Sequence, residues 1–215
     1  MKKNYAIVDT ETLGGASDAY VHTYDLSAVA YDRNGIWLDS IQIVILENLI
    51  LDTAYYGKFK KNFYKSLLRM PSTTICYTEA EAEEVFLEWA EDNEITTLCA
   101  HNSGFDFTKT FLRDSISDFE FIDTWLAFAE TIGQTKRYND FCKANGYVTR
   151  NGNLKMTAEI CYRFISNNND FIEEHTAFSD ASIEAELLFA IFKTHKKFTR
   201  NQHQGNVNKF VRVRG

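Results

Sequence analysis

Residues 4–15 read NYAIVDTETLGG, an apolar run that ends abruptly in acidic residues. The apolar part is typical of a buried β-strand. Asp9 and Glu11 are separated by one residue, and side chains of a strand alternate between its two faces, so both carboxylates are expected on the same side. Taken alone, such a pair is more often a solvated strand end than a site, and its interpretation depends on the rest of the chain.

Two further acidic residues lie at predicted element boundaries. Asp106 follows a short apolar strand predicted at 96–100, and Asp180 lies where a final helix is predicted to start, five residues after His175. Each has a plainer interpretation, because either aspartate can cap a helix and the histidine can be a surface residue. Ligand crevices form at the ends of strands in α/β sheets, so the joint pattern predicts that the four carboxylates converge.

Converging carboxylates repel one another unless a cation neutralises them. Mg²⁺ prefers carboxylate oxygens and water as ligands. Two such ions about 3.5–4 Å apart stabilise the attacking and leaving oxygens of an in-line phosphoryl displacement. A histidine, whose ordinary pKa is about 6.5, can accept a proton from the attacking water. These residue types therefore predict metal-dependent phosphoryl chemistry.

The remaining pattern indicates one α/β domain with a mixed sheet. Residues 24–32 and 36–46 are rich in β-forming residues and are joined across Asn34-Gly35, a strong hairpin signal. Thr78 and Glu81 fit a capping box that begins a helix. Later patterns predict helices at about 105–114, 124–130, 138–145 and 155–166, and a short strand near 121–123.

Composition limits the class of protein. The 215 residues are 45% hydrophobic with a single proline, enough to bury a core and unlike a disordered chain. No apolar run approaches the ~18 residues that cross a bilayer, and the chain turns acidic before a signal-peptide core can form. The four cysteines are scattered, without a CxxC pair. We therefore expect a cytoplasmic protein with reduced thiols and no membrane partner.

Charge is distributed unevenly. The net charge is −7, yet residues 193–215 contain seven Lys or Arg and no acidic residue. Residues 54–78 are also free of acids, and in them lysines alternate with aromatic residues. Cations that follow phosphates and rings that stack on bases suit single-stranded nucleic acid. A solvated amphipathic helix and a frayed basic tail are the alternatives.

The three acidic motifs, taken together, resemble a known family. VDTETLGG at 8–15, HNSGFD at 101–106 and HTAFSDA at 175–181 look like the exonuclease motifs of the DEDDh, or DnaQ-like, 3′–5′ exonucleases. The resemblance covers residues 4–192, and it divides the chain into an exonuclease domain (1–192) and a basic C-terminal tail (193–215). It implies an RNase H-like α/β fold with a mixed five-stranded sheet flanked by helices. Thr176 stands where the tyrosine variant of the superfamily has its Tyr, which points to the histidine subclass.

The resemblance also implies roles for the acidic residues and the histidine. Asp9, Glu11 and Asp180 correspond to the ligands of the ion beside the attacking water. Asp9 would bridge to a second ion, which Asp106 would hold largely through water. The ions would be two Mg²⁺, for which Mn²⁺ is expected to substitute, and His175 corresponds to the general base.

Four further residues correspond to substrate-binding positions of the family. The backbone around Thr12 and Leu13 would meet the 3′-terminal nucleotide, with the Leu13 side chain wedged against a base. Asn102 and Phe105 would shape the pocket beside the substrate. The basic, aromatic insert at 54–70 departs from the family pattern, and its place in the chain would put it near the substrate groove.

The function implied by the resemblance is a metal-dependent 3′–5′ exonuclease that releases nucleoside 5′-monophosphates from single-stranded 3′ ends. The motifs do not read the 2′-hydroxyl; the chain length and third motif favour DNA. One alternative is an RNA 3′-end trimmer or oligoribonuclease-like enzyme. Another is a non-catalytic nucleic-acid-binding module that accompanies a polymerase or another protein. Inactivated relatives usually lose a carboxylate or the histidine, and all five residues are present here.

Overall fold

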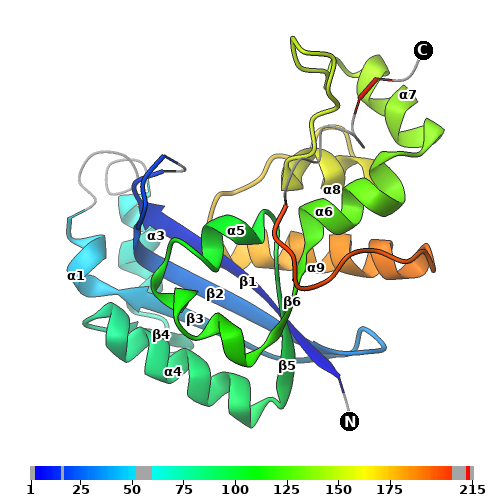
Figure 1. Cartoon of the computed structure of the whole chain (residues 1–215). Helices are drawn as coiled ribbons and strands as arrows, with labels where there is room; N and C mark the ends of the chain where they lie inside the picture. Colours follow the sequence, from blue (N-terminus) through cyan, green and yellow to red (C-terminus); the bar gives the residue numbers. More distant parts are fainter. Residues whose placement is uncertain (1–2, 16, 52–59, 205–211, 214–215) are drawn as a thin grey trace.

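The computed structural model of the chain describes residues 3–15, 17–51, 60–204 and 212–213. Its centre is a mixed sheet with the strand order β4-β3-β2-β1-β5-β6 (Figure 1). The strands are β1 (Asn4–Leu13), β2 (His22–Asp32), β3 (Trp37–Ile45), β4 (Thr73–Cys76), β5 (Ile95–Ala100) and β6 (Glu120–Asp123). The predicted α/β architecture is confirmed, but the described part of the sheet has six strands instead of five.

The additional strand is β4, which pairs in parallel with β3 from Gln42↔Thr73 to Ile45↔Cys76. It lies in the acid-free stretch 54–78, which the sequence predicts as partly helical. A four-residue strand is too short to show a clear period, and as an edge strand it leaves Ile75 exposed. Pairing with β3 is therefore what makes this segment a strand.

Strand directions bring the motif-bearing ends together. β2 is antiparallel to both β1 and β3, and the β2–β3 turn contains Gly35 at φ +80°, so the predicted Asn34-Gly35 hairpin is confirmed. β5 is parallel to β1, with Ile7 opposite Cys99, and β6 is parallel to β5. The carboxyl ends of β1, β5 and β6 consequently lie at one edge of the sheet.

Helices cover both faces of the sheet. Thr78 and Glu81 form both hydrogen bonds of the predicted capping box at the start of α4. The described helices are α1 (Leu46–Leu49), α3 (Lys61–Leu67), α4 (Glu79–Asp92), α5 (Ser103–Asp106), α6 (Thr124–Phe128), α7 (Lys136–Ala144), α8 (Ala158–Ser166) and α9 (Ala177–Lys193). A π turn at Ala129–Gly133 extends α6, and 3₁₀ turns occupy Phe111–Arg113 and Ile116–Asp118.

Two helix boundaries differ from the prediction. The helix expected at 105–114 is divided, because α5 ends at Asp106 and the Thr110 hydroxyl caps the 3₁₀ turn that follows. The last helix begins at Ala177 with Thr176 as its N-cap. Neither Asp106 nor Asp180 is a helix cap, so the plainer interpretation of both residues is wrong.

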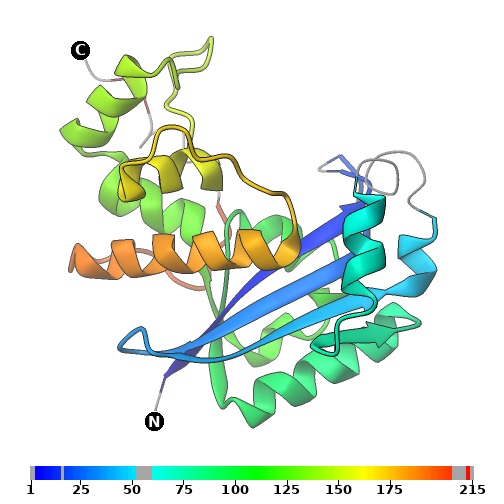
Figure 2. The same ribbon diagram turned by 180° about the vertical axis from the view of Figure 1, so that it is seen from behind.

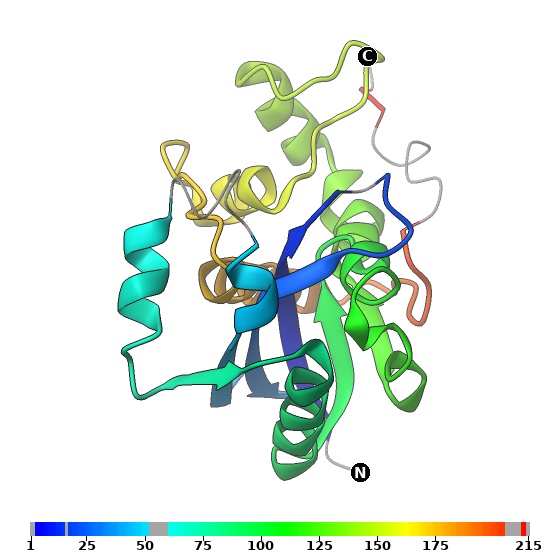
Figure 3. The ribbon, with the colours of Figure 1, turned by 90° about the vertical axis from the view of Figure 1, so that its left-hand side faces the viewer.

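The sheet separates two hydrophobic cores, with α4 on one face and α9, α8 and α6 on the other (Figures 2 and 3). Along β1, Ile7 belongs to the α9 core, whereas Ala6 and Val8 belong to the α4 core. The same alternation carries Asp9 and Glu11 to the face covered by α9. The sheet thus presents both carboxylates to the first turn of that helix.

Two expectations from composition can be compared with the structure. All four cysteines are free and buried; they are Cys76, Cys99, Cys142 and Cys161. In the part of the chain that the structure describes, no helix combines the length and apolarity needed to span a membrane.

Candidate metal and nucleic-acid site

Three of the predicted ligands meet where β1 passes the start of α9. Carboxylate oxygens of Asp9, Glu11 and Asp180 all lie within 4.8 Å of one another. The two strand residues reach this point by alternation along β1, and Asp180 reaches it from the first turn of α9. Asp180 thereby joins one carboxylate cluster with Asp9 and Glu11, which lie 171 and 169 positions before it in the chain.

Asp106 stands beside this cluster, at the end of α5. Its Oδ1 accepts a hydrogen bond of 2.7 Å from the Thr10 hydroxyl, and its side chain is buried. Burial raises the pKa of Asp106 to about 7, and the bond from Thr10 opposes this rise. The charge of Asp106 also helps to raise the pKa of Asp9. The charge of Asp106, in the short helix that follows β5, therefore interacts with the carboxylates of the cluster.

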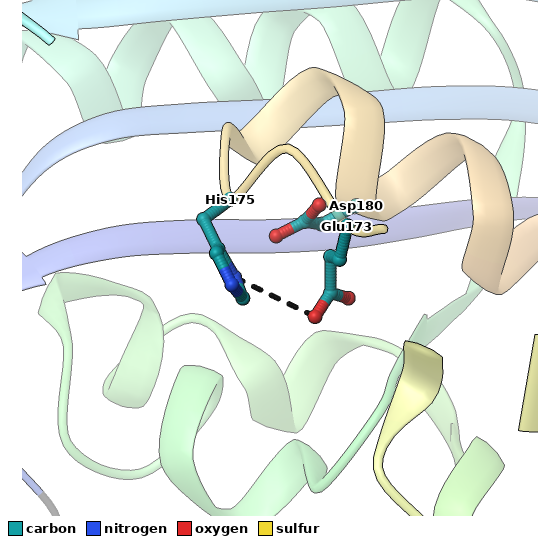
Figure 4. Close-up of side chains that lie close together, drawn as sticks. All are labelled: Glu173, His175 and Asp180. Carbon is teal, nitrogen blue, oxygen red and sulfur yellow. Dashed lines mark ion pairs between the residues drawn. The ribbon is translucent and has the colours of Figure 1, made fainter. Parts of the chain in front are cut away.

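His175 lies in the loop before α9, where its side chain faces Glu173 close to Asp180 (Figure 4). Its backbone is left-handed, with φ +55°, and 58% of its side chain is exposed. Its Nδ1 is 3.5 Å from Glu173 Oε2, and ligand atoms of His175, Glu173 and Asp180 lie within 4.8 Å of one another. A left-handed conformation is unfavourable for histidine, so the loop imposes this placement of the imidazole.

The structure adds three acidic residues that the sequence reasoning missed. Glu184 is buried one helical turn after Asp180, and its Oε2 accepts the His101 backbone N–H at 2.9 Å. The i,i+4 spacing on α9 was a signal for Glu184. Asp25 lies opposite Glu11 on β2, where an acid before the run LSAVAY was also a signal. Glu173 lies in a loop without periodicity, and no local pattern distinguishes it.

Burial and mutual repulsion make these carboxyl groups reluctant to ionise together. Burial is the largest cause in each case, and it raises the pKa of Asp9 and of Glu184 well above the ordinary range. Burial raises the pKa of Glu11 to about 8 and that of Asp180 to about 7, with further repulsion from neighbouring acids. A site that concentrates this much potential negative charge favours the binding of a cation.

The donor set fits a hard divalent cation. Every side chain in the cluster offers carboxylate oxygens, the ligands preferred by Mg²⁺ and Mn²⁺. Asp180 Oδ1 is buried and has no hydrogen-bond partner in the described residues. A buried charged oxygen without a partner is costly, and coordination of a cation in the cluster would satisfy it.

One cation of the protein already approaches the cluster. Lys60 immediately precedes α3, and its Nζ is 3.8 Å from Glu11 Oε1. Helix α3 is held against β2 by the Tyr64 hydroxyl, which donates to Asp25 Oδ2 at 3.1 Å, and by the edge-on contact of Tyr64 with Tyr24. The described part of the basic insert, residues 60–70, therefore borders the site, while residues 52–59 lie outside the described ranges.

The predicted substrate residues do not all border one cavity. A pocket of about 640 Å³ opens at the carboxylates of Asp9 and Asp180, and Asn102 and Trp125 contribute to its wall. Thr12 follows an irregularity in the β1–β2 register, Leu13 packs against the cluster of Tyr24 and Tyr64, and Phe105 is half-buried in α5. Of the four, Asn102 lines this pocket.

Comparisons with known proteins bear on the fold. No family model matches the chain, and no curated protein matches it. A structure described as "3'-end specific recognition of histone mRNA stem-loop by 3'-exonuclease" has a TM-score of 0.57 at 12% identity, covering 96% of this chain and 88% of that one. A full-length 3′-exonuclease has a TM-score of 0.56 at 13% identity, covering 96% and 89%. Cell-death related nuclease 4 (CRN-4) has a TM-score of 0.53 at 15% identity, covering 93% and 67%. The chain therefore has the RNase H-like fold of these nucleases.

Proposed function

We propose that the protein is a metal-dependent 3′–5′ exonuclease of the DEDDh type that releases nucleoside 5′-monophosphates from single-stranded 3′ ends. The observation that carries the proposal is the cluster of Asp9, Glu11 and Asp180 on a fold shared with 3′-exonucleases; it includes a buried oxygen of Asp180 that has no hydrogen-bond partner among the described residues. Asp106 and His175 stand beside this cluster from two other elements. These contacts support one site for the five residues of the sequence motifs.

The carboxylates would hold two Mg²⁺ or Mn²⁺ ions, with Asp9, Glu11 and Asp180 around one and Asp9 and Asp106 toward the other. Such ions, when bound, stabilise the charge that develops on a phosphoryl group during displacement. The residues themselves must first lose their protons, because the raised pKa values leave part of the cluster protonated near neutral pH. Ion binding is therefore coupled to proton release.

His175 is placed to act as the general base. Its exposed side chain can reach a water molecule that enters from solvent. Glu173 faces Nδ1, and when ionised it favours the tautomer that carries the proton on that nitrogen. Nε2 is then the acceptor for a proton from the attacking water. In this role Glu173 orients the histidine and does not contact the substrate.

DNA and RNA, which differ in their sugar, are the two candidate substrates. The sequence features favour DNA. An RNA 3′-end trimmer is the second candidate, favoured by the similarity to the 3′-exonuclease whose structure is described with a histone mRNA stem-loop. The non-catalytic polymerase-accessory module remains the alternative from another class. On composition and motif grounds we place the enzyme in the cytoplasm.

A degradation assay with matched DNA and RNA oligonucleotides tests the proposal. Each strand carries a 5′ label and is incubated with Mg²⁺, Mn²⁺ or chelator. A metal-dependent ladder that shortens from the 3′ end is expected, and the faster strand identifies the sugar. Calorimetric titration with Mn²⁺ gives a readout independent of activity. Binding of oligonucleotides without cleavage under all conditions would favour the accessory-module alternative.

A further inference from the structure

The chain after α9 returns to the site as a short segment, residues 199–204, which we call the C-terminal strap. Thr199 donates through its backbone N–H and its hydroxyl to the Glu130 carboxylate, at 2.7 and 2.9 Å. Asn201 pairs with the edge of β6, because its N–H donates to Phe121 O and its Oδ1 accepts the Phe121 N–H. These bonds hold the strap along the last strand of the sheet (Figure 1).

The end of the strap is attached to buried groups near the site. The His203 ring stacks on Phe121 with a centroid distance of 4.4 Å, and its Nδ1 is 2.9 Å from the Ser103 hydroxyl. The Gln204 N–H donates to Asp123 Oδ2 at 2.7 Å. Asp123 is 1% exposed and also caps α6. The hydrogen bond to this buried aspartate therefore holds the backbone of Gln204 in place.

The side chain of Gln204 extends from this anchor to the pocket. Its Nε2 donates to Asn102 Oδ1 at 2.9 Å, across 102 positions of sequence. Both residues line the 640 Å³ pocket that also contains the carboxylates of Asp9 and Asp180. The strap thus contributes a side chain to the wall of the proposed active site.

The Asn102–Gln204 pair leaves hydrogen-bonding groups for a ligand. A primary amide has two donor hydrogens and one acceptor oxygen, and one bond between two amides uses one donor and one acceptor. Within the described ranges, no hydrogen bond engages Asn102 Nδ2 or Gln204 Oε1. Reversing both amides gives the same result, so the pair leaves a donor on one side chain and an acceptor on the other in either orientation.

We propose that Gln204 is a substrate-positioning residue, which together with Asn102 hydrogen-bonds the terminal nucleotide through a group that both accepts and donates. The inference rests on the proposed function. Two parts of a nucleotide have this chemistry. A ribose 2′-hydroxyl is both donor and acceptor, and the edge of a nucleobase presents donors and acceptors side by side. Asn102 and Gln204 could hydrogen-bond either of these two groups.

The test compares Gln204→Ala with Thr199→Ala, which weakens the strap at its far end without touching the pocket. We expect Gln204→Ala to raise KM for a single-stranded oligonucleotide by about 3- to 10-fold, as for loss of one or two hydrogen bonds, with kcat within about twofold. Thr199→Ala should leave both constants unchanged. The double variant Asn102→Ala/Gln204→Ala should add little to either single change, because the two side chains act as a pair.

Two sets of oligonucleotide substrates identify the group of the terminal nucleotide that Gln204 and Asn102 hydrogen-bond. One pair of oligonucleotides differs only in a deoxyribose or ribose at the 3′ end, and a second set differs only in the terminal base. A Gln204→Ala effect confined to the ribose substrate identifies the 2′-hydroxyl, whereas an effect that follows the base identifies the nucleobase edge. An unchanged KM, or equal losses in Gln204→Ala and Thr199→Ala with a lower Tm in both, would overturn the proposal.

A binding assay separates the positioning role of Gln204 from the proposed exonuclease activity. Fluorescence anisotropy in chelator measures oligonucleotide binding whether or not the protein cleaves its ligand. A wild-type protein that binds but does not cleave, with weaker binding by Gln204→Ala alone, would retain the positioning role and remove the enzymatic one. Equal binding by the wild type and Gln204→Ala in this assay would remove the positioning role.

Discussion

Lys60 Nζ lies 3.8 Å from Glu11 Oε1, so the basic insert supplies a positive charge directly to the carboxylate cluster. Burial raises the pKa of Glu11 to about 8, and Lys60 is the largest influence in the opposite direction. The lysine also acts against the raised pKa values of Asp180 and Glu173. The insert therefore keeps the cluster more ionised than its burial alone would allow.

Substitution of Lys60 by Met should change the pH dependence of the proposed exonuclease activity. Without the ammonium the pKa of Glu11 rises further, so more of the cluster is protonated at pH 7 and the apparent affinity for Mg²⁺ falls several-fold. The acidic limb of the rate–pH profile moves to higher pH. Lys65→Met, at an exposed lysine of the adjoining helix α3, is the matched control. Tighter Mg²⁺ binding by Lys60→Met would contradict this role and show that the ammonium competes with the ion.

Asp180→Asn should abolish metal binding while the fold is retained. The amide has nearly the same shape as the carboxylate but lacks the charge that a hard cation requires. It also removes the charge from an oxygen that is buried and has no hydrogen-bond partner in the described part of the chain. We expect turnover to fall about 100-fold or more, in line with the loss of one transition-state contact. Calorimetry with Mn²⁺ and thermal unfolding in chelator are the measurements. Asp114→Asn, at a side chain that is 82% exposed, should behave like the wild type.

His175→Ala should affect turnover rather than binding. Loss of a general base lowers kcat by about 10²- to 10⁴-fold, and KM should change little because the role proposed for His175 is proton transfer and not substrate binding. Asn tolerates the left-handed backbone found at this position, so His175→Asn separates loss of the base from loop distortion. Comparable losses of oligonucleotide affinity in both variants, with kcat preserved, would assign His175 to binding instead.

The metal-free protein should lose stability as the pH rises. Glu11, Asp106 and Asp180 have pKa values of about 8, 7 and 7 in the folded state, above the value of about 4 for unfolded carboxyl groups. Between these values the native state binds more protons than the unfolded state, so the free energy of unfolding decreases from about pH 4 to about pH 8.

Thermal unfolding at pH 6 and pH 8, in chelator and in Mg²⁺, measures this linkage. The Tm in chelator should be lower at pH 8, and Mg²⁺ should raise Tm more at pH 8 than at pH 6, because bound ions replace the protons. An equal Mg²⁺ effect at both values would mean that the cluster is already ionised in the metal-free protein.

Local patterns of the sequence determined much of the framework. The period of β1 places Asp9 and Glu11 on one face, the Asn34-Gly35 turn produces the hairpin, and the box at Thr78 begins α4. Each feature depends on residues within a few positions of one another. For that reason each can be predicted from the sequence without knowledge of the tertiary structure. The motif at 175–181 likewise placed Asp180 close to the start of the last helix.

Only the tertiary structure decided which distant groups share the site. Strand β4 exists through its pairing with β3, Lys60 reaches Glu11 because α3 docks on β2, and Gln204 reaches Asn102 because the strap follows the β6 edge. These contacts join segments separated by tens of residues, and no period or spacing encodes them. Packing and hydrogen bonding of the folded chain bring a lysine and a glutamine beside Asp9, Glu11, Asp106 and Asp180, the four acids that the sequence motifs predicted, and they add Glu173, which no local pattern indicates.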